Sequence, residues 1–169
     1  LLQPLRWRKP REIFVAAHGD LFHPNVPDEW LDKIFAVMLL AHWHTFQVLT
    51  KRSARMRAYL QGLTLDRIQR AAQGLPDTGF VPWQFPFPNV HVGVSCEDQK
   101  RADLRVPDLL ATPAAKRFVS AEPLLSAIDF NSYPDRMWLR TVGSDGAAVR
   151  PGLDQIITGG ESGRGARRP

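Results

Sequence analysis

The stretch KRFVSAEPLL, from Lys116 to Leu125, carries the pattern on which the whole chain is built. Phe118 to Ala121 is apolar and rich in residues that favour β-structure, as expected of a short buried strand. Pro123 has no N–H and favours an extended residue before it, so the strand should end at Glu122. The stretch therefore predicts a buried strand that presents a carboxylate at its C-terminal end.

Four other segments repeat this pattern of an apolar strand followed by an ionisable group. They are IFVAAHGD (Ile13–Asp20), TFQVLTK (Thr45–Lys51), NVHVGVSCED (Asn89–Asp98) and DQIITGGES (Asp154–Ser162). Most of the intervening sequence has helical character, which is typical of βα units. Parallel βα units place functional residues at the C-terminal ends of their strands. We therefore expect one site to gather the five ionisable groups: Asp20, Lys51, Glu97, Glu122 and Glu161.

These segments predict a single α/β domain over residues 1–169 with about five parallel strands. Helices are expected over Ser53–Gln61 and over Gln99–Arg105, the second capped by Asp98 and ended before Pro107. Residues 126–152 are expected to form an insertion, as a loop or a hairpin. Because the chain opens at Leu1 rather than Met and stops just after a glycine-rich turn, we expect a fragment that is incomplete at both ends.

Composition narrows the classes of protein to which the chain can belong. Of its 169 residues, 44% are hydrophobic, and the longest apolar run, Ile34–Ala41, is far shorter than the roughly 20 residues that cross a bilayer. The one cysteine, Cys96, excludes an intrachain disulfide and fits a reducing, cytoplasmic environment. It also excludes an iron–sulfur cluster held by cysteines of this sequence alone. The net charge of +5 is scattered, as on a solvated surface, but it permits attraction to nucleic acid.

The predicted strand-end groups are compatible with several chemistries. Carboxylates can hold a divalent cation, grip the amino group of a zwitterionic ligand, or act as general acid and base. Lys51, Glu97 and Glu122 are the candidate catalytic residues. Gly159 and Gly160 allow a ligand to approach the backbone, and their N–H groups can bind an anion. Alternatively, all these groups pair with neighbouring basic side chains and only cap the strand ends.

Five motifs in order, FVAAHGDLFHPNVPDEW, HTFQVLTKRSARM, NVHVGVSCEDQ, RFVSAEPLL and IITGGESGRGAR, resemble a phage-associated family named for gene products thirty-seven and sixty-eight. That family is a domain of unknown function with a three-cysteine motif, and it is similar to radical S-adenosylmethionine proteins. The resemblance implies a partial, half TIM-like βα barrel with helices on its outer face. It also implies that the cluster-binding loop lies upstream of Leu1.

The resemblance further implies cofactor-binding roles. By position, Asp20 resembles the acidic residue that grips the amino group of S-adenosylmethionine. Five more residues would line the mouth that holds the cofactor and the substrate: Ser95, Glu122, Gly159, Gly160 and Glu161.

Three functional hypotheses follow from the sequence. The first is a fragment of a radical S-adenosylmethionine-type enzyme with an unknown substrate, inactive alone because the cluster loop is missing. The second is a divalent-metal-dependent hydrolase or lyase with four carboxylate ligands: Asp20, Glu97, Glu122 and Glu161. The third is a non-catalytic module that associates with nucleic acid. A fragment with exposed sheet edges is also expected to self-associate.

Overall fold

A five-stranded parallel sheet forms the centre of the protein, whose structure is a computed structural model. The structure describes residues 1–79, 81, 84–131, 137–139, 141–142, 148–150 and 152–161, with the side chains of 141–142 and 148–150 left out. The strands, in their order across the sheet, are β1 (Glu12–Val15), β2 (Thr45–Thr50), β3 (Val90–Ser95), β4 (Lys116–Ala121) and β7 (Gln155–Thr158). Every pairing is parallel, which confirms the predicted α/β fold.

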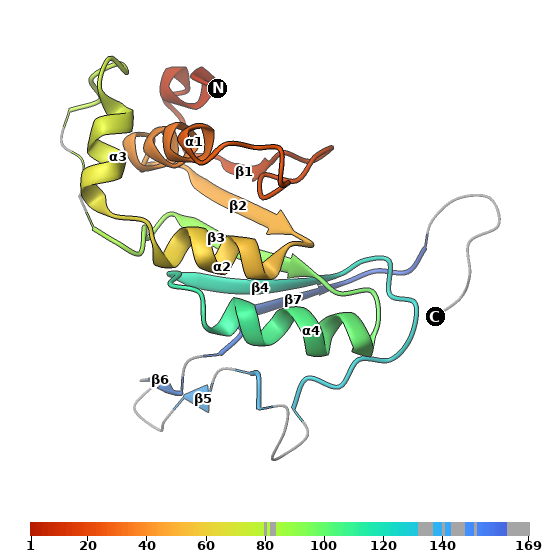
Figure 1. Ribbon diagram of the computed structural model, residues 1–169. Coiled ribbons are helices and arrows are strands. Elements are labelled where there is room, and N and C mark those ends of the chain that lie inside the picture. Colours follow the sequence, from red (N-terminus) through yellow and green to blue (C-terminus); the bar gives the residue numbers. More distant parts are fainter. Residues whose placement is uncertain are drawn as a thin grey trace.

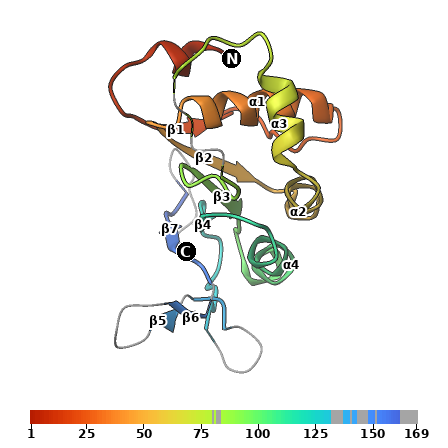
Figure 2. The same cartoon turned by 90° about the vertical axis from the view of Figure 1, so that its left-hand side faces the viewer.

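In the part of the chain that the structure describes, four α-helices lie on one side of this sheet. They are α1 (Asp28–Leu40), α2 (Ser53–Gln61), α3 (Leu65–Ala72) and α4 (Gln99–Leu110), and a short 3-10 helix, η1 (Gln3–Arg6), precedes β1. Figure 2 shows the helices together on one side, with α1, α2 and α4 next to the strands that they follow. One helix-covered and one helix-free face in a parallel sheet is consistent with the expected half TIM-like barrel.

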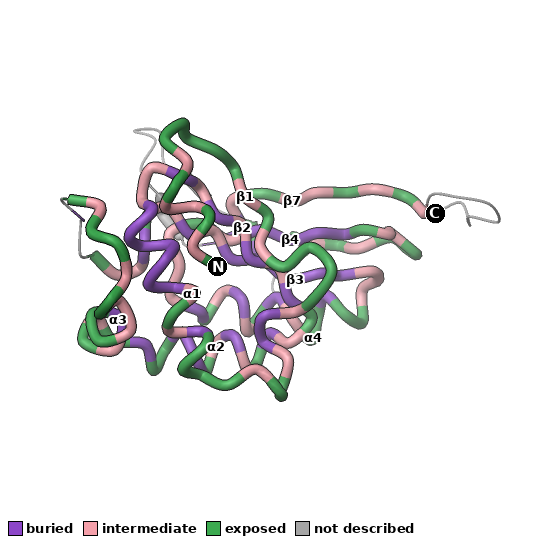
Figure 3. The backbone as a smooth tube through the Cα atoms, turned by 90° about the horizontal axis from the view of Figure 1, so that it is seen from above, coloured by how far each residue is buried: buried purple, intermediate pink, exposed green. Residues whose placement is uncertain are grey.

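The two faces of the sheet carry different side chains because residues alternate along each strand. On β3, Val90, Val92 and Val94 point into the core beneath the helices and are buried. The intervening residues point to the helix-free face, where Gly93 lies against the ring of Phe118. A Cβ at Gly93 would come within 2.6 Å of that ring, so the close packing of β3 and β4 requires glycine there. Figure 3 shows the buried backbone concentrated in the central strands and the inner sides of the helices.

The first strand ends earlier than the sequence pattern predicted. We expected the strand pattern to run to Asp20, but β1 ends at Val15. Ala16 follows with φ of +55°, a left-handed conformation that breaks the extended backbone. Asp20 therefore lies in the loop between β1 and α1, not at the tip of a strand.

Two short strands lie apart from the main sheet. β5 (Thr141–Val142) pairs antiparallel with β6 (Ala148–Arg150) within the segment where we expected an insertion or hairpin. Residues 143–147, between the two strands, are outside the described residues. Figure 1 shows the two strands below β7, away from the carboxyl ends of the parallel strands.

Candidate functional site

The carboxyl edge of the sheet carries the five ionisable groups predicted from the sequence. Because the strands are parallel and adjacent, residues that follow them meet at this edge. Three of the five are linked by contacts, because Asp20 accepts from the Lys51 N–H and the Lys51 ammonium pairs with Glu97. Glu122 lies against Gly159. Glu161 lies beyond the end of β7, at the limit of the described residues.

Asp20 bridges the β1–α1 loop and the end of β2. One carboxylate oxygen accepts hydrogen bonds from the Thr50 hydroxyl (2.7 Å) and the Phe22 N–H (2.9 Å). The other accepts from the Lys51 N–H (3.2 Å) and the Arg52 guanidinium (2.8 Å). Burial alone would raise the pKa of Asp20, but these hydrogen bonds outweigh it and lower the pKa below its ordinary value.

These four bonds decide what Asp20 can still bind. A carboxylate offers about four lone-pair sites, and each faces one protein donor here. A ligand's ammonium group would have to displace one of these donors. The role of Asp20 as a cofactor ligand stays a prediction, and the observed geometry gives it a structural role.

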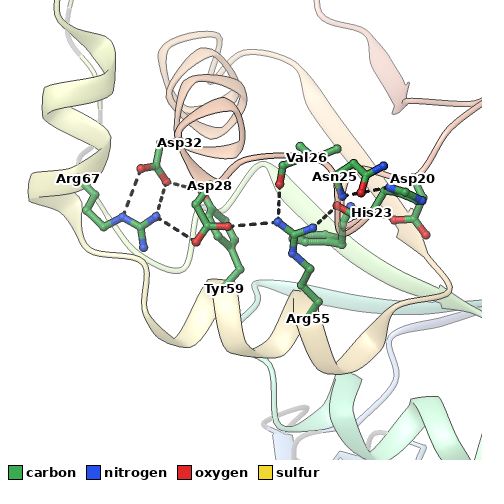
Figure 4. A network of polar contacts seen from close by, with 10 residues as sticks. Asp20, His23, Asn25, Val26, Asp28, Asp32, Arg55, Tyr59 and Arg67 are labelled. Carbon is green, nitrogen blue, oxygen red and sulfur yellow. Dashed lines mark hydrogen bonds and ion pairs between the residues drawn. The ribbon is translucent and has the colours of Figure 1, made fainter.

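A polar network also holds the β1–α1 loop in place (Figure 4). Arg55 of α2 points toward this loop, where its guanidinium donates to the backbone carbonyls of His23 and Val26 and pairs with Asp28 at 3.3 Å. The His23 ring accepts a hydrogen bond from the Asn25 N–H (3.2 Å), so it stabilises the loop locally. The basic sequence of α2 gave no sign that one arginine is turned inward.

The same network continues to α3 through Asp32 of α1. Arg67 donates to both carboxylate oxygens of Asp32, at 2.8 and 3.3 Å, and Tyr59 donates its hydroxyl to the same carboxylate at 2.8 Å. Burial and Asp32 together raise the pKa of Tyr59 above its ordinary value, so its hydroxyl remains a donor. The three helices α1, α2 and α3 are thereby fixed behind the loop that carries Asp20.

Glu97 lies between two cations. One oxygen pairs with the Lys51 ammonium, and the other accepts from the Arg105 guanidinium at 3.0 Å. Arg105 also donates to the Ser95 carbonyl at 2.7 Å, which joins α4 to the end of β3. Burial would raise the pKa of Glu97, but the Lys51 hydrogen bond and the nearby Arg105 lower it. Glu97 is therefore ionised at neutral pH, which favours a role in charge pairing rather than as a general acid.

Lys51 and Arg105 differ in how readily they could release Glu97. The Lys51 side chain is 55% exposed, whereas that of Arg105 is 14% exposed and held by two hydrogen bonds. Lys51 is thus the partner that a ligand at the carboxyl edge could displace. Sequence reasoning missed Arg105, because nothing in the α4 sequence distinguishes it from the other basic residues there.

Glu122 and Gly159 touch across the ends of β4 and β7. A Cβ at Gly159 would lie closer than 3.0 Å to a Glu122 carboxylate oxygen, so only glycine leaves room for this side chain. The backbone fixes the contact from both sides. The Gly159 N–H donates to the Ala121 carbonyl (3.3 Å), and its carbonyl accepts from the Leu124 N–H (2.7 Å). Among the predicted cofactor-binding residues, this pair places an exposed carboxylate at the carboxyl edge of the sheet.

The structure also bears on Cys96 and on the hypothesis that carboxylates hold a divalent metal ion. Cys96 points into the core, and burial raises the pKa of its thiol to about 12. Within the described part of the chain, no three His, Cys, Asp or Glu side chains are gathered as metal ligands would be. The described helices likewise include none long and apolar enough to cross a membrane.

The fold and edge geometry define a parallel α/β protein with a carboxylate-bearing strand edge. Over residues 1–169 the sequence matches the family described as protein of unknown function (DUF5131), and the chain belongs to that family. No curated protein and no solved structure matches it.

Proposed function

We propose that this chain is the S-adenosylmethionine-binding part of a radical S-adenosylmethionine-type enzyme. The supporting observation is the contact between Glu122 and Gly159 at the ends of two adjacent parallel strands. It offers a carboxylate at the carboxyl edge of the sheet that can accept hydrogen bonds from ribose hydroxyls. The five sequence motifs resemble a family that is similar to radical S-adenosylmethionine proteins, and this resemblance also supports the proposal, as does the half-barrel arrangement of the sheet.

The iron–sulfur cluster of such enzymes does not fit the residues of this chain. Such a cluster is held by several thiolates, and the sequence has one cysteine, which is buried beneath the helices. Thiolates from outside these residues would be required. Binding of S-adenosylmethionine is therefore the role proposed for the residues of this chain.

Calorimetric titration with S-adenosylmethionine and S-adenosylhomocysteine tests the proposal. We expect saturable binding of both, because they share the adenosine and amino-acid groups. Gly159→Ala should weaken binding about tenfold, equivalent to ~1.4 kcal/mol, because the new methyl group displaces the Glu122 carboxylate. Glu122→Gln should weaken it similarly. Because the displaced atom is the far end of a flexible side chain, the Gly159→Ala protein should melt close to the wild type.

Gly62→Ala is the matched control. Gly62 follows α2, and a Cβ there would come no closer than 3.4 Å to the Ala58 carbonyl oxygen, an ordinary contact distance. Its binding should equal that of the wild type. A folded chain that binds neither ligand would refute the proposal. So would unchanged affinity in both Gly159→Ala and Glu122→Gln.

A further inference from the structure

A pocket of about 420 Å³ lies on the helix-free face of the sheet, toward the amino-terminal ends of the strands. This volume falls within the usual range for small-molecule sites, roughly 300–1,000 Å³. All five strands contribute side chains to its lining: Glu12, Gln47, His91, Lys116, Phe118 and Gln155. Nothing in the proposed function uses these residues.

The strand register places the polar side chains side by side. Gln47 is the direct partner of His91, and His91 is the direct partner of Lys116. At about 4.8 Å between neighbouring strands, this row spans roughly 10 Å. His91 and Glu97 are six positions apart on the same strand and its extension, which corresponds to about 20 Å. The pocket is thus separate from the carboxyl edge and is about as wide as a nucleoside is long.

Three polar side chains that line the pocket are available for a ligand. Within the described residues, those of Gln47, His91 and Gln155 form no hydrogen bond with the protein. Each carboxamide offers both donors and an acceptor. Burial and the nearby Lys116 lower the pKa of His91 below its ordinary value, so its neutral ring supplies one donor and one acceptor near pH 7.

The charges around the pocket disfavour an anionic ligand. Two carboxylates, Glu12 and Asp154, line it together with the Lys116 ammonium. The Arg117 guanidinium is directed elsewhere, because it donates to the Thr112 carbonyl at 2.8 Å. A phosphate would meet more negative than positive charge here, whereas an uncharged polar molecule would not be repelled.

We propose that this pocket binds an uncharged, nucleoside-sized heterocycle. Gln47, His91 and Gln155 provide alternating donors and acceptors for the polar edge of its ring, as carboxamides do for adenine. Phe118 also lines the pocket, where its buried ring contributes a small apolar surface. The volume accommodates the base together with its ribose.

Titration of the ¹⁵N-labelled chain with adenosine, guanosine, cytidine and uridine, followed by NMR, tests this inference. At least one nucleoside should bind saturably and shift the His91 ring signals. Its 5′-monophosphate should bind at least threefold more weakly because of Glu12 and Asp154. Gln47→Leu and His91→Phe should each weaken nucleoside binding at least tenfold. Gln73→Leu, at an exposed glutamine next to α3, is the matched control and should leave the affinity unchanged.

Glu122→Gln separates this inference from the proposed function, because Glu122 lies at the carboxyl edge and not in the pocket. Nucleoside affinity should be unchanged in this variant even where S-adenosylmethionine binding is lost. Three results would overturn the inference: no nucleoside saturates the folded chain, the affinity is insensitive to both pocket substitutions, or it falls in Glu122→Gln. Binding of a disaccharide in place of every nucleoside would also overturn it.

Discussion

The Asp20 carboxylate joins two segments that are far apart in the sequence. It accepts from Phe22 in its own loop and from Thr50 and Arg52 at the β2–α2 junction. Since its side chain is only 16% exposed, water cannot readily replace these donors. Removing its charge should therefore affect the stability of the whole carboxyl edge.

We predict that Asp20→Asn lowers the free energy of unfolding by about 2 kcal/mol at pH 7, because hydrogen bonds to a charged group are lost and an amide donor faces other donors. Urea unfolding measures the difference. Asp66→Asn, at a side chain that is 74% exposed, should change it by less than about 0.5 kcal/mol. Equal stability of Asp20→Asn and the wild type would contradict the structural role of this carboxylate.

The difference in stability between the wild type and Asp20→Asn should depend on pH. The folded state lowers the pKa of Asp20, so the stabilisation from its charge is complete above the ordinary carboxyl pKa of about 4. This stabilisation is lost as the pH falls through the lowered pKa, because Asp20 is then protonated in the folded state as well. The difference between wild type and Asp20→Asn should therefore shrink in urea titrations below about pH 4.

At the scale of elements, α4 continues past Pro107, although the helix was expected to end before this residue. The helix continues from Gln99 to Leu110 with Pro107 inside it. Ala102, Val106 and Leu109 are all buried on its inner side. Burial of this continuous apolar face outweighs the hydrogen bond that Pro107 cannot donate, and the predicted end at Arg105 was wrong.

Pro107→Ala should raise the free energy of unfolding by about 1–2 kcal/mol. Alanine restores the missing N–H donor, and the gain is partly offset because the unfolded chain becomes more flexible. Pro107 is exposed, so no core packing is lost. Thermal unfolding measures this change, and Pro76→Ala is the control. Because Pro76 is an exposed proline in a loop, Pro76→Ala should not be more stable than the wild type. A loss of stability in Pro107→Ala would show that the proline is favourable where it stands.

The elements that could be predicted from the sequence are those with strong local signals. The bounds of α2, Ser53–Gln61, are those expected, and the alternation of strand and helix gave the parallel order of the sheet. The end of β1 could not be predicted, because nothing about an alanine indicates the positive φ of Ala16. The partners of Glu97 depend on how α4 packs beside β3, which local sequence does not encode.

At the scale of the whole molecule, β1 and β7 are the two edge strands of the sheet within the described residues. Edge strands present unpaired N–H and C=O groups to which another chain can pair. Phe14 on β1 is 46% exposed and adds an apolar contact at this edge. The expected self-association of the chain remains a prediction, and β1 is where the structure allows it to be tested.

Phe14→Glu should weaken self-association, because a charge at an edge strand disfavours pairing with another chain. Sedimentation velocity at several concentrations should show a larger monomer fraction than for the wild type. Leu104→Glu, at an exposed residue of α4, should behave as the wild type does. A wild-type chain that stays monomeric at every concentration would contradict the prediction.

The order of the strands across the sheet also has a consequence for synthesis on the ribosome. From β1 to β4, each strand pairs with the next one along the chain, and β7 then adds to β4. A chain that emerges amino-terminus first can therefore extend the sheet one strand at a time, because no later strand has to insert between two earlier ones. The two longest intervening segments are residues 51–89 and residues 122–154, so the addition of β3 to β2 and of β7 to β4 must wait until these segments have left the exit tunnel.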